Sequence, residues 1–333
     1  MTSPYQQFLK EFGAGRIFEN IPLEKFSSMR IGGVGDLFFK AGSLNDLVRS
    51  FSLVRKLKIP YFLLGGGTNT LFSDQGFRGL VIRNETQGIR LAGIRSGVVK
   101  NIPGGPSKRK IFLEVESGVF LNRLVRFTLD QGFAGLEAFL GQPGTVGGAI
   151  YINAHNAKKN MFFGDSIFSA KLLTKQGEIV NVDRKYFRFG YDESSIQKSG
   201  DIVLSVVIGL DGGDRKELWK QAQEALEYRM GTQPTGVYSL GCTFRNISKS
   251  EAIRLSTAEF TCSAGYLLER VGLKGMKKGK ASFSPLHANF IVHSGEAKGS
   301  DVLELIHLAK RKVMEKFGIV LQEEIVVVGD HYE

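Results

Sequence analysis

The stretch Leu64-Gly65-Gly66-Gly67-Thr68-Asn69-Thr70-Leu71-Phe72-Ser73-Asp74 decides the fold of this chain. It follows an apolar run, residues 59–64, whose length and composition predict a buried strand. Because glycine lacks a Cβ, three in succession let backbone N–H groups point into one concavity and approach a ligand closely. Such a nest binds anions, above all phosphate. The alternative is a glycine-rich hairpin turn, and the spacing matches neither the P-loop nor the GxGxxG fingerprint.

A second glycine cluster lies at residues 132–149 and contains the run Pro143-Gly144-Thr145-Val146-Gly147-Gly148. It is nearly free of bulky polar side chains, so its backbone can approach a large flat ligand closely. A tight connection beneath a domain core is the alternative. Two such clusters in one chain favour a ligand site.

Composition narrows the class of protein. The chain has 333 residues, of which 42% are hydrophobic, so two or three globular domains are expected. No apolar stretch approaches about 20 residues, which excludes a membrane span. Two cysteines, and an N-terminus without a signal-peptide core, indicate a reduced, cytoplasmic protein, and no His/Cys spacing indicates a metal site. The net charge of +11 is spread along the chain without a nucleic-acid-binding signature, so we expect no nucleic-acid partner.

The order of strand-like and helix-like segments predicts an α+β protein. Residues 1–21 are a lead-in; residues 22–212 form one domain with lobes at 22–84 and 85–212; residues 213–333 form a second, smaller domain. A basic loop is expected at residues 95–110. Ser43 and Asp301 are expected to cap helices, and Gly318 to end the second of them.

The two glycine clusters and the motifs around them resemble those of a known family. From about Ser27 to Gly329 the chain resembles the UDP-N-acetylenolpyruvoylglucosamine reductases, flavoenzymes of bacterial cell-wall synthesis. The resemblance is carried by the order and spacing of several motifs: residues 29–33, 63–74, 142–148 with Asn153-Ala154, Gln233-Pro234, 239–246, 264–269, 272–275 and 287–292. The short interval between Phe189 and Gln233 is similar to the family's second type, which lacks an extra loop.

The resemblance implies a two-lobed FAD-binding domain of the vanillyl-alcohol-oxidase/PCMH type beside a smaller α+β substrate-binding domain. It also implies which residues hold FAD: Gly65, Gly66, Gly67, Thr68 and Asn69 at the pyrophosphate, and Gly118, Pro143, Gly144, Thr145, Gly147 and Gly148 along the rest of the cofactor. None of the five histidines lies on or before the glycine loop, so we expect non-covalent FAD.

The implied reaction is the reduction of an enolpyruvyl ether on a UDP-sugar, with NADPH as co-substrate. The family's proton donor is a serine or cysteine in a Gly-Ser/Cys-x-Phe turn, and Gly241-Cys242-Thr243-Phe244 places Cys242 there. A thiol, with a reference pKa of about 8.5, is acidic enough for this role. The alternative is an inert core cysteine. The family's C-terminal glutamate corresponds to Glu324, which can hydrogen-bond the developing enolate when protonated; the alternative is an exposed glutamate such as Glu323.

The chain departs from the family at one position. An arginine that holds the substrate carboxylate follows Gly-Tyr in the family, whereas this chain has Asp192 after Gly190-Tyr191. An anion there would repel the carboxylate. Candidate replacements are Arg188, Arg229 and Arg245. The candidate substrate-binding residues are Tyr191, Arg229, Gln233 and Asn246.

Two alternatives to the reductase remain open: an FAD-binding homologue with lost or altered activity, which Asp192 favours, and a flavin oxidase of the same superfold. A monomer is expected in each case.

Overall fold

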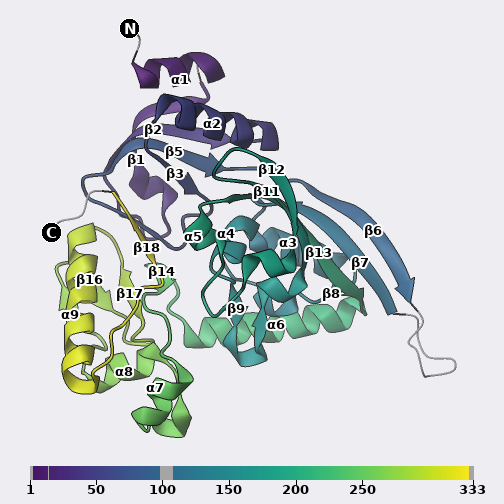
Figure 1. Ribbon diagram of the computed structural model, residues 1–333. Coiled ribbons are helices and arrows are strands. Elements are labelled where there is room, and N and C mark those ends of the chain that lie inside the picture. The colour runs from purple at the N-terminus through teal and green to yellow at the C-terminus, as the bar shows by residue number, and fades with distance from the viewer. Residues whose placement is uncertain (1–2, 14, 98–107, 330–333) are drawn as a thin grey trace, which may run out of the picture. The chain divides into compact units, whose positions relative to one another are not determined.

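The computed structural model describes residues 3–13, 15–97 and 108–329, which divide into two compact units (Figure 1). The first unit contains Met1–Ile17, Phe39–Gly66 and Ile82–Arg229, and the second contains Phe18–Phe38, Gly67–Val81 and Met230–Glu333. The chain therefore passes between the units several times, once within the glycine loop itself.

The first unit is built on a six-stranded sheet in which every recorded pairing is antiparallel. Its order is β12 (Ile179–Asp183), β11 (Ile167–Leu173), β13 (Ile202–Gly212), β7 (Lys108–Glu116) and β6 (Ile89–Gly97), with β8 (Phe133–Ala134) also paired to β13. Strand residues alternate between the two faces of a sheet, and Ile111, Leu113 and Val115 of β7 all point to the core. Helices α3 (Leu121–Asp130), α4 (Val146–Tyr151) and α6 (Arg215–Thr232) supply the apolar residues that pack with them.

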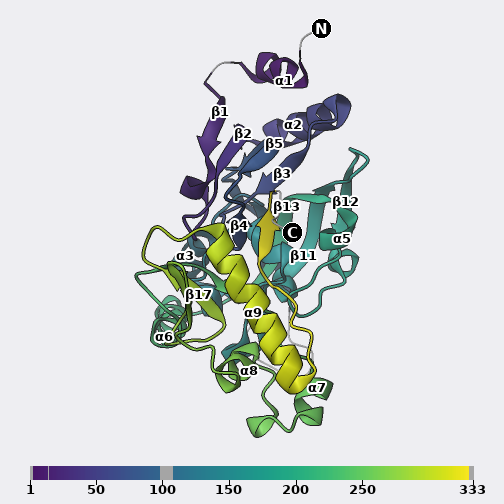
Figure 2. The same cartoon turned by 90° about the vertical axis from the view of Figure 1, so that its left-hand side faces the viewer.

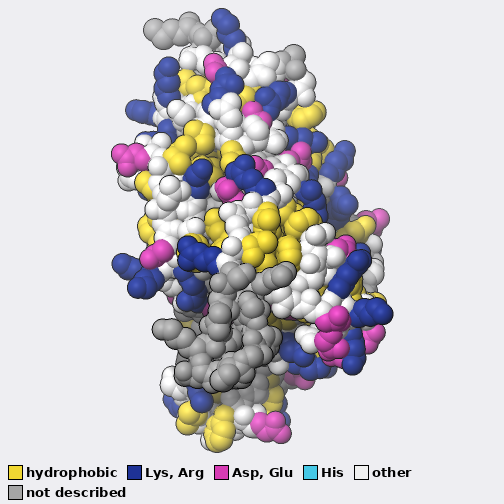
Figure 3. Space-filling model, turned by 90° about the vertical axis from the view of Figure 1, so that its right-hand side faces the viewer, with side chains coloured by type: hydrophobic (Ala, Val, Ile, Leu, Met, Phe, Trp, Pro, Cys, Tyr) yellow, Lys and Arg dark blue, Asp and Glu magenta, His cyan; other side chains and the backbone are white. Residues whose placement is uncertain are grey.

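Several apolar side chains of this sheet are exposed instead of pointing to the core. Leu91, Ile94 and Phe168 are each more than half exposed, and the rings of Phe112 and Phe168 meet edge to face at 4.9 Å. Figure 3 views the molecule from the side of β6 and β7 and shows hydrophobic side chains exposed among charged ones. An antiparallel sheet tolerates one solvated face, so this exposure is compatible with the fold.

The remaining elements of the first unit precede or flank the glycine clusters. They are α1 (Pro4–Phe12), α2 (Leu44–Leu57), β3 (Tyr61–Leu64), β9 (His155–Asn156), β10 (Met161–Phe162) and α5 (Ile196–Ser199). Ser43 caps α2 as predicted, in a reciprocal capping box with Asp46. A four-stranded sheet has the order β1 (Ile17–Pro22), β2 (Val34–Ala41), β5 (Phe77–Asn84) and β3.

The second unit combines a small antiparallel sheet with helices. The sheet order is β14 (Tyr238–Cys242), β17 (Phe290–His293), β16 (Ala281–Phe283) and β15 (Lys277–Lys278); the helices are α7 (Lys249–Arg254), α8 (Ala264–Arg270) and α9 (Gly299–Phe317). Helix α9, prominent in Figure 2, buries one apolar stripe in the core of this unit: Val302, Leu305, Ile306, Ala309 and Val313. The last strand, β18 (Val326–Val328), pairs in parallel with β4 (Thr70–Phe72), which follows the glycine loop.

Asp74, the last residue of the glycine stretch, satisfies the start of α9. Its two carboxylate oxygens accept hydrogen bonds from the backbone N–H groups of Gly299 (2.6 Å) and Ser300 (3.0 Å). A negative charge is favourable at a helix N-terminus. The prediction that Asp301 caps this helix is wrong, because Lys298 is the N-cap residue and Asp301 is the third residue of the helix, where its carboxylate accepts the Lys298 N–H. The predicted end at Gly318, in the left-handed conformation, is confirmed.

Two sequence expectations differ from the structure. We expected the second domain to begin at residue 213, but Leu218 and Ala222 of α6 pack in the core of the first unit, which extends to Arg229. The expected basic loop at residues 95–110 is shorter on both sides, since β6 continues to Gly97 and β7 begins at Lys108. Its central part, residues 98–107, lies outside the described residues.

Candidate active site

In the first unit, the two glycine clusters meet. A Cβ built on Gly65 would lie 2.6 Å from Oγ1 of Thr145, closer than a side chain tolerates. Thr145 is the N-cap residue of α4, and its Oγ1 accepts the N–H of Gly148 at 3.3 Å. The start of the glycine loop and the Thr145 turn therefore lie against each other in the first unit.

Gly118 and Gly147 also lie close to neighbouring segments. A Cβ on Gly118 would come within 2.5 Å of Asn84 Oδ1, and a Cβ on Gly147 would lie 3.2 Å from Ser117. The Gly147 N–H donates to the Ser117 carbonyl at 2.8 Å, which fixes the two segments side by side. Pro143 and Gly144 precede them, and the Gly144 carbonyl accepts the Leu121 N–H. Uncharged backbone in this arrangement fits the close approach that a flavin dinucleotide requires.

In the second unit, the same loop is fixed at Gly67. Its φ is +66°, and a Cβ there would lie 1.9 Å from the carbonyl oxygen of Phe26. The Gly67 carbonyl accepts the N–H of Ser28 at 2.9 Å. No other residue type fits this position without moving the chain. Thr68 and Asn69 follow in the same unit.

Asn69 connects the loop to the two candidate catalytic residues. Its side-chain Nδ2 donates to the backbone carbonyl of Glu324 at 2.9 Å, and the Glu324 N–H donates to the carbonyl of Thr243 at 2.9 Å. Thr243 directly follows Cys242, so both candidate residues belong to one hydrogen-bonded backbone network. Cys242 is a partly buried cysteine at the end of β14 and belongs to no disulfide.

The turn that carries Cys242 is irregular. The register of β14 against β17 shifts between Ser239 and Cys242, and Gly241 between them has a φ of +86°. An irregularity of this kind re-aims the side chains that follow it. Gly241 therefore has a backbone conformation that favours glycine over other residues.

The sequence analysis missed the residue that clamps this turn. The side-chain amide of Asn289 accepts the Phe244 N–H at 2.9 Å and donates to the Phe244 carbonyl at 2.8 Å. The Asn289 N–H in turn donates to Nδ1 of His287 at 3.2 Å. Burial lowers the pKa of the His287 imidazole below its ordinary value, and the Glu269 carboxylate partly offsets this effect. The motif His287-Ala288-Asn289 was visible in the sequence, but its partner lies far away along the chain.

The candidate substrate-binding residues divide between the units. Tyr191 and Arg229 lie in the first unit, and Gln233 and Asn246 in the second. Arg229 is beside Gly141, where an added Cβ would lie 3.9 Å from the arginine Cδ. The Oδ1 atom of Asn246 accepts the Ala264 N–H, which gives this side chain a structural partner.

Asp192, the departure from the family pattern, is buried. Its side chain is 1% exposed, its φ is +53°, and its Oδ1 lies 3.2 Å from Nδ1 of His155. The His155 ring lies 4.6 Å from the ring of Tyr191. The carboxylate thus faces the imidazole of His155 rather than open solvent, and its two buried oxygens accept no hydrogen bond from the described residues. No motif in the sequence indicates that Asp192 and His155 lie next to each other.

Two kinds of feature are absent from the described ranges. They contain no cluster of three or more His, Cys, Asp or Glu side chains able to hold a metal ion. No helix in residues 3–13, 15–97 and 108–329 is long and apolar enough to cross a membrane.

Comparison with known proteins identifies the class first. Residues 35–183 match the family model described as FAD binding domain, so the chain is a flavoprotein. Residues 233–328 match the model of the UDP-N-acetylenolpyruvoylglucosamine reductase C-terminal domain. The chain is 34% identical over 310 residues to the UDP-N-acetylenolpyruvoylglucosamine reductase of Chlamydia muridarum, covering 93% of this chain and 94% of that one. The chain belongs to the UDP-N-acetylenolpyruvoylglucosamine reductase family.

Two further relatives support the assignment. The reductase of Caldanaerobacter subterraneus is 33% identical over 330 residues, 99% of this chain and 98% of its own length. The crystal structure of the reductase from Thermus caldophilus superimposes with a TM-score of 0.71 at 28% identity, covering 92% of this chain and 97% of that chain. The predicted family, α+β flavoprotein fold and FAD cofactor are confirmed. The roles of individual site residues stay predictions.

Gly65→Ala is predicted to weaken FAD binding. The new methyl group displaces Thr145 Oγ1, which then loses its hydrogen bond to Gly148. Loss of an N-cap bond costs about 0.5–2 kcal/mol, so the dissociation constant for FAD should rise about 2- to 30-fold. Flavin fluorescence during titration of the apoprotein measures it.

Gly42→Ala is the matched control, because a Cβ there meets nothing within 4 Å and its φ is not positive. If Gly65→Ala and Gly42→Ala bind FAD equally well, the Gly65–Thr145 approach is not part of the cofactor site.

The lowered pKa of His287 predicts a loss of stability in mild acid. The folded state binds this proton less readily than the unfolded chain, so the contribution of neutral His287 is complete above about pH 6.5 and is lost as the pH falls through the folded-state pKa. Protonated Nδ1 can no longer accept the Asn289 N–H. The midpoint of thermal unfolding, measured from about pH 7 to pH 5, should fall more for the wild type than for His287→Gln. His307→Gln, at an exposed position of α9, should behave as the wild type does; an unchanged pH profile in His287→Gln would contradict the prediction.

Proposed function

We propose that this chain reduces the enolpyruvyl group of UDP-N-acetylglucosamine enolpyruvate to give UDP-N-acetylmuramate for peptidoglycan synthesis, with NADPH as the reductant. The observation that carries the proposal is the shared network of Asn69, Cys242 and Glu324. Asn69 Nδ2 lies 2.9 Å from the Glu324 carbonyl, and the Glu324 N–H lies 2.9 Å from the carbonyl next to Cys242. The side chain of Asn69 is therefore bonded to the backbone of Glu324, and that backbone is bonded to Thr243, the residue after Cys242.

The chemistry requires one hydride and one proton. FAD, which Gly65 to Asn69 and the turn at residues 143–148 would hold, would supply the hydride for the terminal carbon of the enolpyruvyl double bond, with NADPH as its source. The neighbouring carbon then needs a proton, and Cys242 is the residue of this chain suited to give it, because a thiol is acidic enough to release a proton near neutral pH.

Glu324 has a different role. Negative charge spreads onto the substrate carboxylate as the hydride arrives, and a protonated carboxyl group can hydrogen-bond to that charge. Glu323, its neighbour, instead forms an ion pair with Lys310 at 2.6 Å. The two adjacent glutamates thus have separate partners.

Recognition of the substrate is assigned to four side chains that the family resemblance singles out. Tyr191, Arg229, Gln233 and Asn246 are the proposed contacts, with Arg229 supplying positive charge. Asp192 stands where the family has its arginine, and its buried carboxylate lies beside His155. We further propose a cytoplasmic monomer with non-covalent FAD; the two free cysteines suit a reducing compartment.

Asp192 also favours a second candidate, an FAD-binding homologue with altered activity. A flavin oxidase is the third possibility. Two measurements separate them: anaerobic reduction of the bound flavin by NADPH, and its reoxidation by the enolpyruvyl sugar nucleotide. Both steps should be fast for the reductase. Flavin that is reoxidised only by oxygen indicates an oxidase, and flavin that responds to neither indicates a binding protein.

Cys242→Ala is predicted to retain FAD and its reduction by NADPH, while reoxidation by the substrate slows about 10²- to 10⁴-fold, the usual cost of losing a general acid. Cys242→Ser should keep measurable turnover. Cys262→Ala removes the other free thiol and serves as the matched control. Stopped-flow absorbance decides the matter, and a wild-type reoxidation rate in Cys242→Ala would make Cys242 a packing residue.

Glu324→Gln is predicted to slow reoxidation by the substrate and to leave flavin reduction nearly unchanged, because the enolate partner is needed only in the second half-reaction. Glu323→Gln is the matched control from the adjacent position. Equal slowing of both half-reactions in Glu324→Gln would show that this glutamate is structural.

A further inference from the structure

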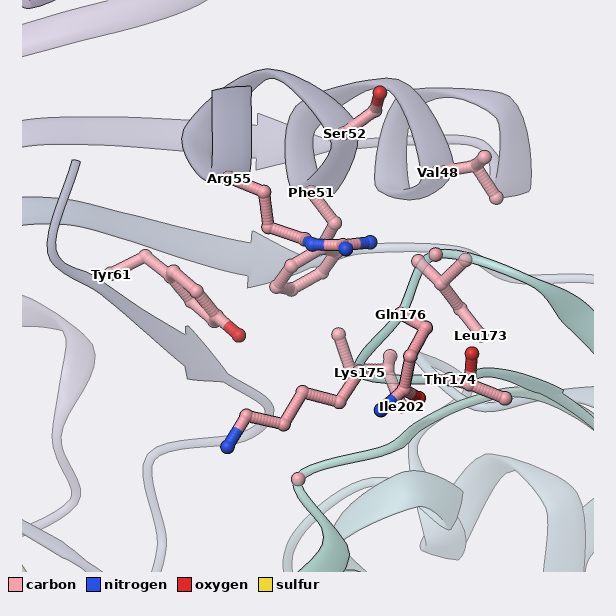
Figure 4. Close-up of a pocket in the computed structure, with 12 residues that line it drawn as sticks. Val48, Phe51, Ser52, Arg55, Tyr61, Leu173, Thr174, Lys175, Gln176 and Ile202 are labelled. Carbon is pink, nitrogen blue, oxygen red and sulfur yellow. The ribbon is translucent and has the colours of Figure 1, made fainter. Parts of the chain in front are cut away.

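A pocket of about 220 Å³ lies within the first unit, away from the residues assigned to FAD (Figure 4). Its walls come from one face of α2, from β3 and from the turn between β11 and β12. The polar and charged side chains of its lining are Ser52, Arg55, Tyr61, Thr174, Lys175 and Gln176. Its volume corresponds to about seven water molecules, more than a bare phosphate ion needs.

The lining carries two positive charges and no acidic residue. Figure 4 shows Arg55 extending from α2 and Lys175 from the facing turn. Among residues 3–13, 15–97 and 108–329, neither side chain has a recorded ion pair or hydrogen bond. Asp201, which accepts the backbone N–H of Lys175, directs its other carboxylate oxygen to the hydroxyl of Tyr186. In Figure 4 the Arg55 guanidinium lies near Phe51 and the Lys175 side chain extends toward Tyr61, so the two charges stand at different places in the pocket. Positive charges in a lining that holds no acidic side chain favour the binding of an anion.

The position of Arg55 is set by the backbone of the turn. Gly177 has a φ of +94°, and a Cβ there would lie 2.3 Å from Nη1 of Arg55. The turn therefore passes directly against the guanidinium group, and any larger residue would displace it. Arg55 is otherwise exposed, and its guanidinium can make the forked hydrogen bonds that this group forms with phosphate oxygens.

An aromatic wall stands next to the charges. The rings of Phe51 and Tyr61 meet edge to face with their centroids 5.1 Å apart, and Tyr61 is 39% exposed. Such a surface accepts the flat face of a ring. The pocket therefore combines positively charged side chains, which can bind a phosphate, with an aromatic surface, which can pack against a ring.

We propose that this pocket binds a ring-bearing phosphomonoester, with Arg55 and Lys175 holding the phosphate and Tyr61 packing against the ring. The site is separate from the proposed reaction and does not depend on it. Because Tyr61 lies on the strand that leads into Gly65, the test must distinguish binding at this pocket from competition with FAD.

The experiment uses the FAD-loaded protein and phenyl phosphate as the probe, with isothermal titration calorimetry for affinity and flavin absorbance for cofactor retention. Saturable binding is expected with FAD retained. Arg55→Gln combined with Lys175→Gln should weaken it about tenfold or more, since each removes a charged hydrogen-bonding partner. Lys56→Gln combined with Lys220→Gln removes the same charge from exposed helical positions and should leave the affinity unchanged.

Several results would overturn the proposal. Unchanged affinity in the Arg55/Lys175 variant would indicate adventitious binding elsewhere. Release of FAD by the probe would make the pocket part of the cofactor site. Equal affinity for inorganic phosphate would remove the role of the ring, and equal affinity for uncharged benzyl alcohol would remove the role of the charges. The absence of saturable binding to the wild type would end the proposal outright.

Discussion

The absence of side chains at Gly65 and Gly67 is the constraint on which the rest of the structure depends. On one side the backbone at Gly65 approaches Thr145 of the second glycine cluster, and on the other the backbone at Gly67 approaches the Phe26 carbonyl. Each approach is too close for any Cβ. The loop is therefore fixed at both ends within the unit to which each end belongs, and its middle is left as bare backbone. A dinucleotide that must be held by main-chain groups needs a loop fixed in this way.

The proposed chemistry follows from how the second unit uses this loop. Asn69 carries no reaction role of its own, yet its amide orients the backbone that bears Glu324. Asn289 does the same for the turn after Cys242. The amides of Asn69 and Asn289 thus hold the backbone segments that carry Glu324 and Cys242. Amides suit this task because each can donate and accept at once without introducing charge near a group that must give up a proton.

Most local features were predictable from the sequence, the cap of α9 being an exception, and long-range ones were not. The glycine loop, the Cys242 turn, the Ser43 cap and the Gly318 helix end each depend on a few neighbouring residues, and all were found where the pattern placed them. The pairing of Asp192 with His155 joins segments with no common motif, so a lone aspartate suggested repulsion. Helix α6 was assigned to the second domain for a similar reason. Its apolar stripe predicts that the helix packs against a core, but it does not identify which core, and α6 packs in the first unit.

Strand β18 is synthesised long after β4, the strand with which it pairs. Asn69 and Glu324 are 255 residues apart, and β4, which follows the glycine loop, pairs with β18 near the C-terminal end of the described chain. A ribosome adds about 5–20 residues per second. The loop thus waits on the order of ten seconds or more after it is made before its partner strand exists. During that interval β4 has no partner strand and the Asn69 amide has no Glu324 carbonyl to bond, so this part of the second unit is completed only when β18 has been made.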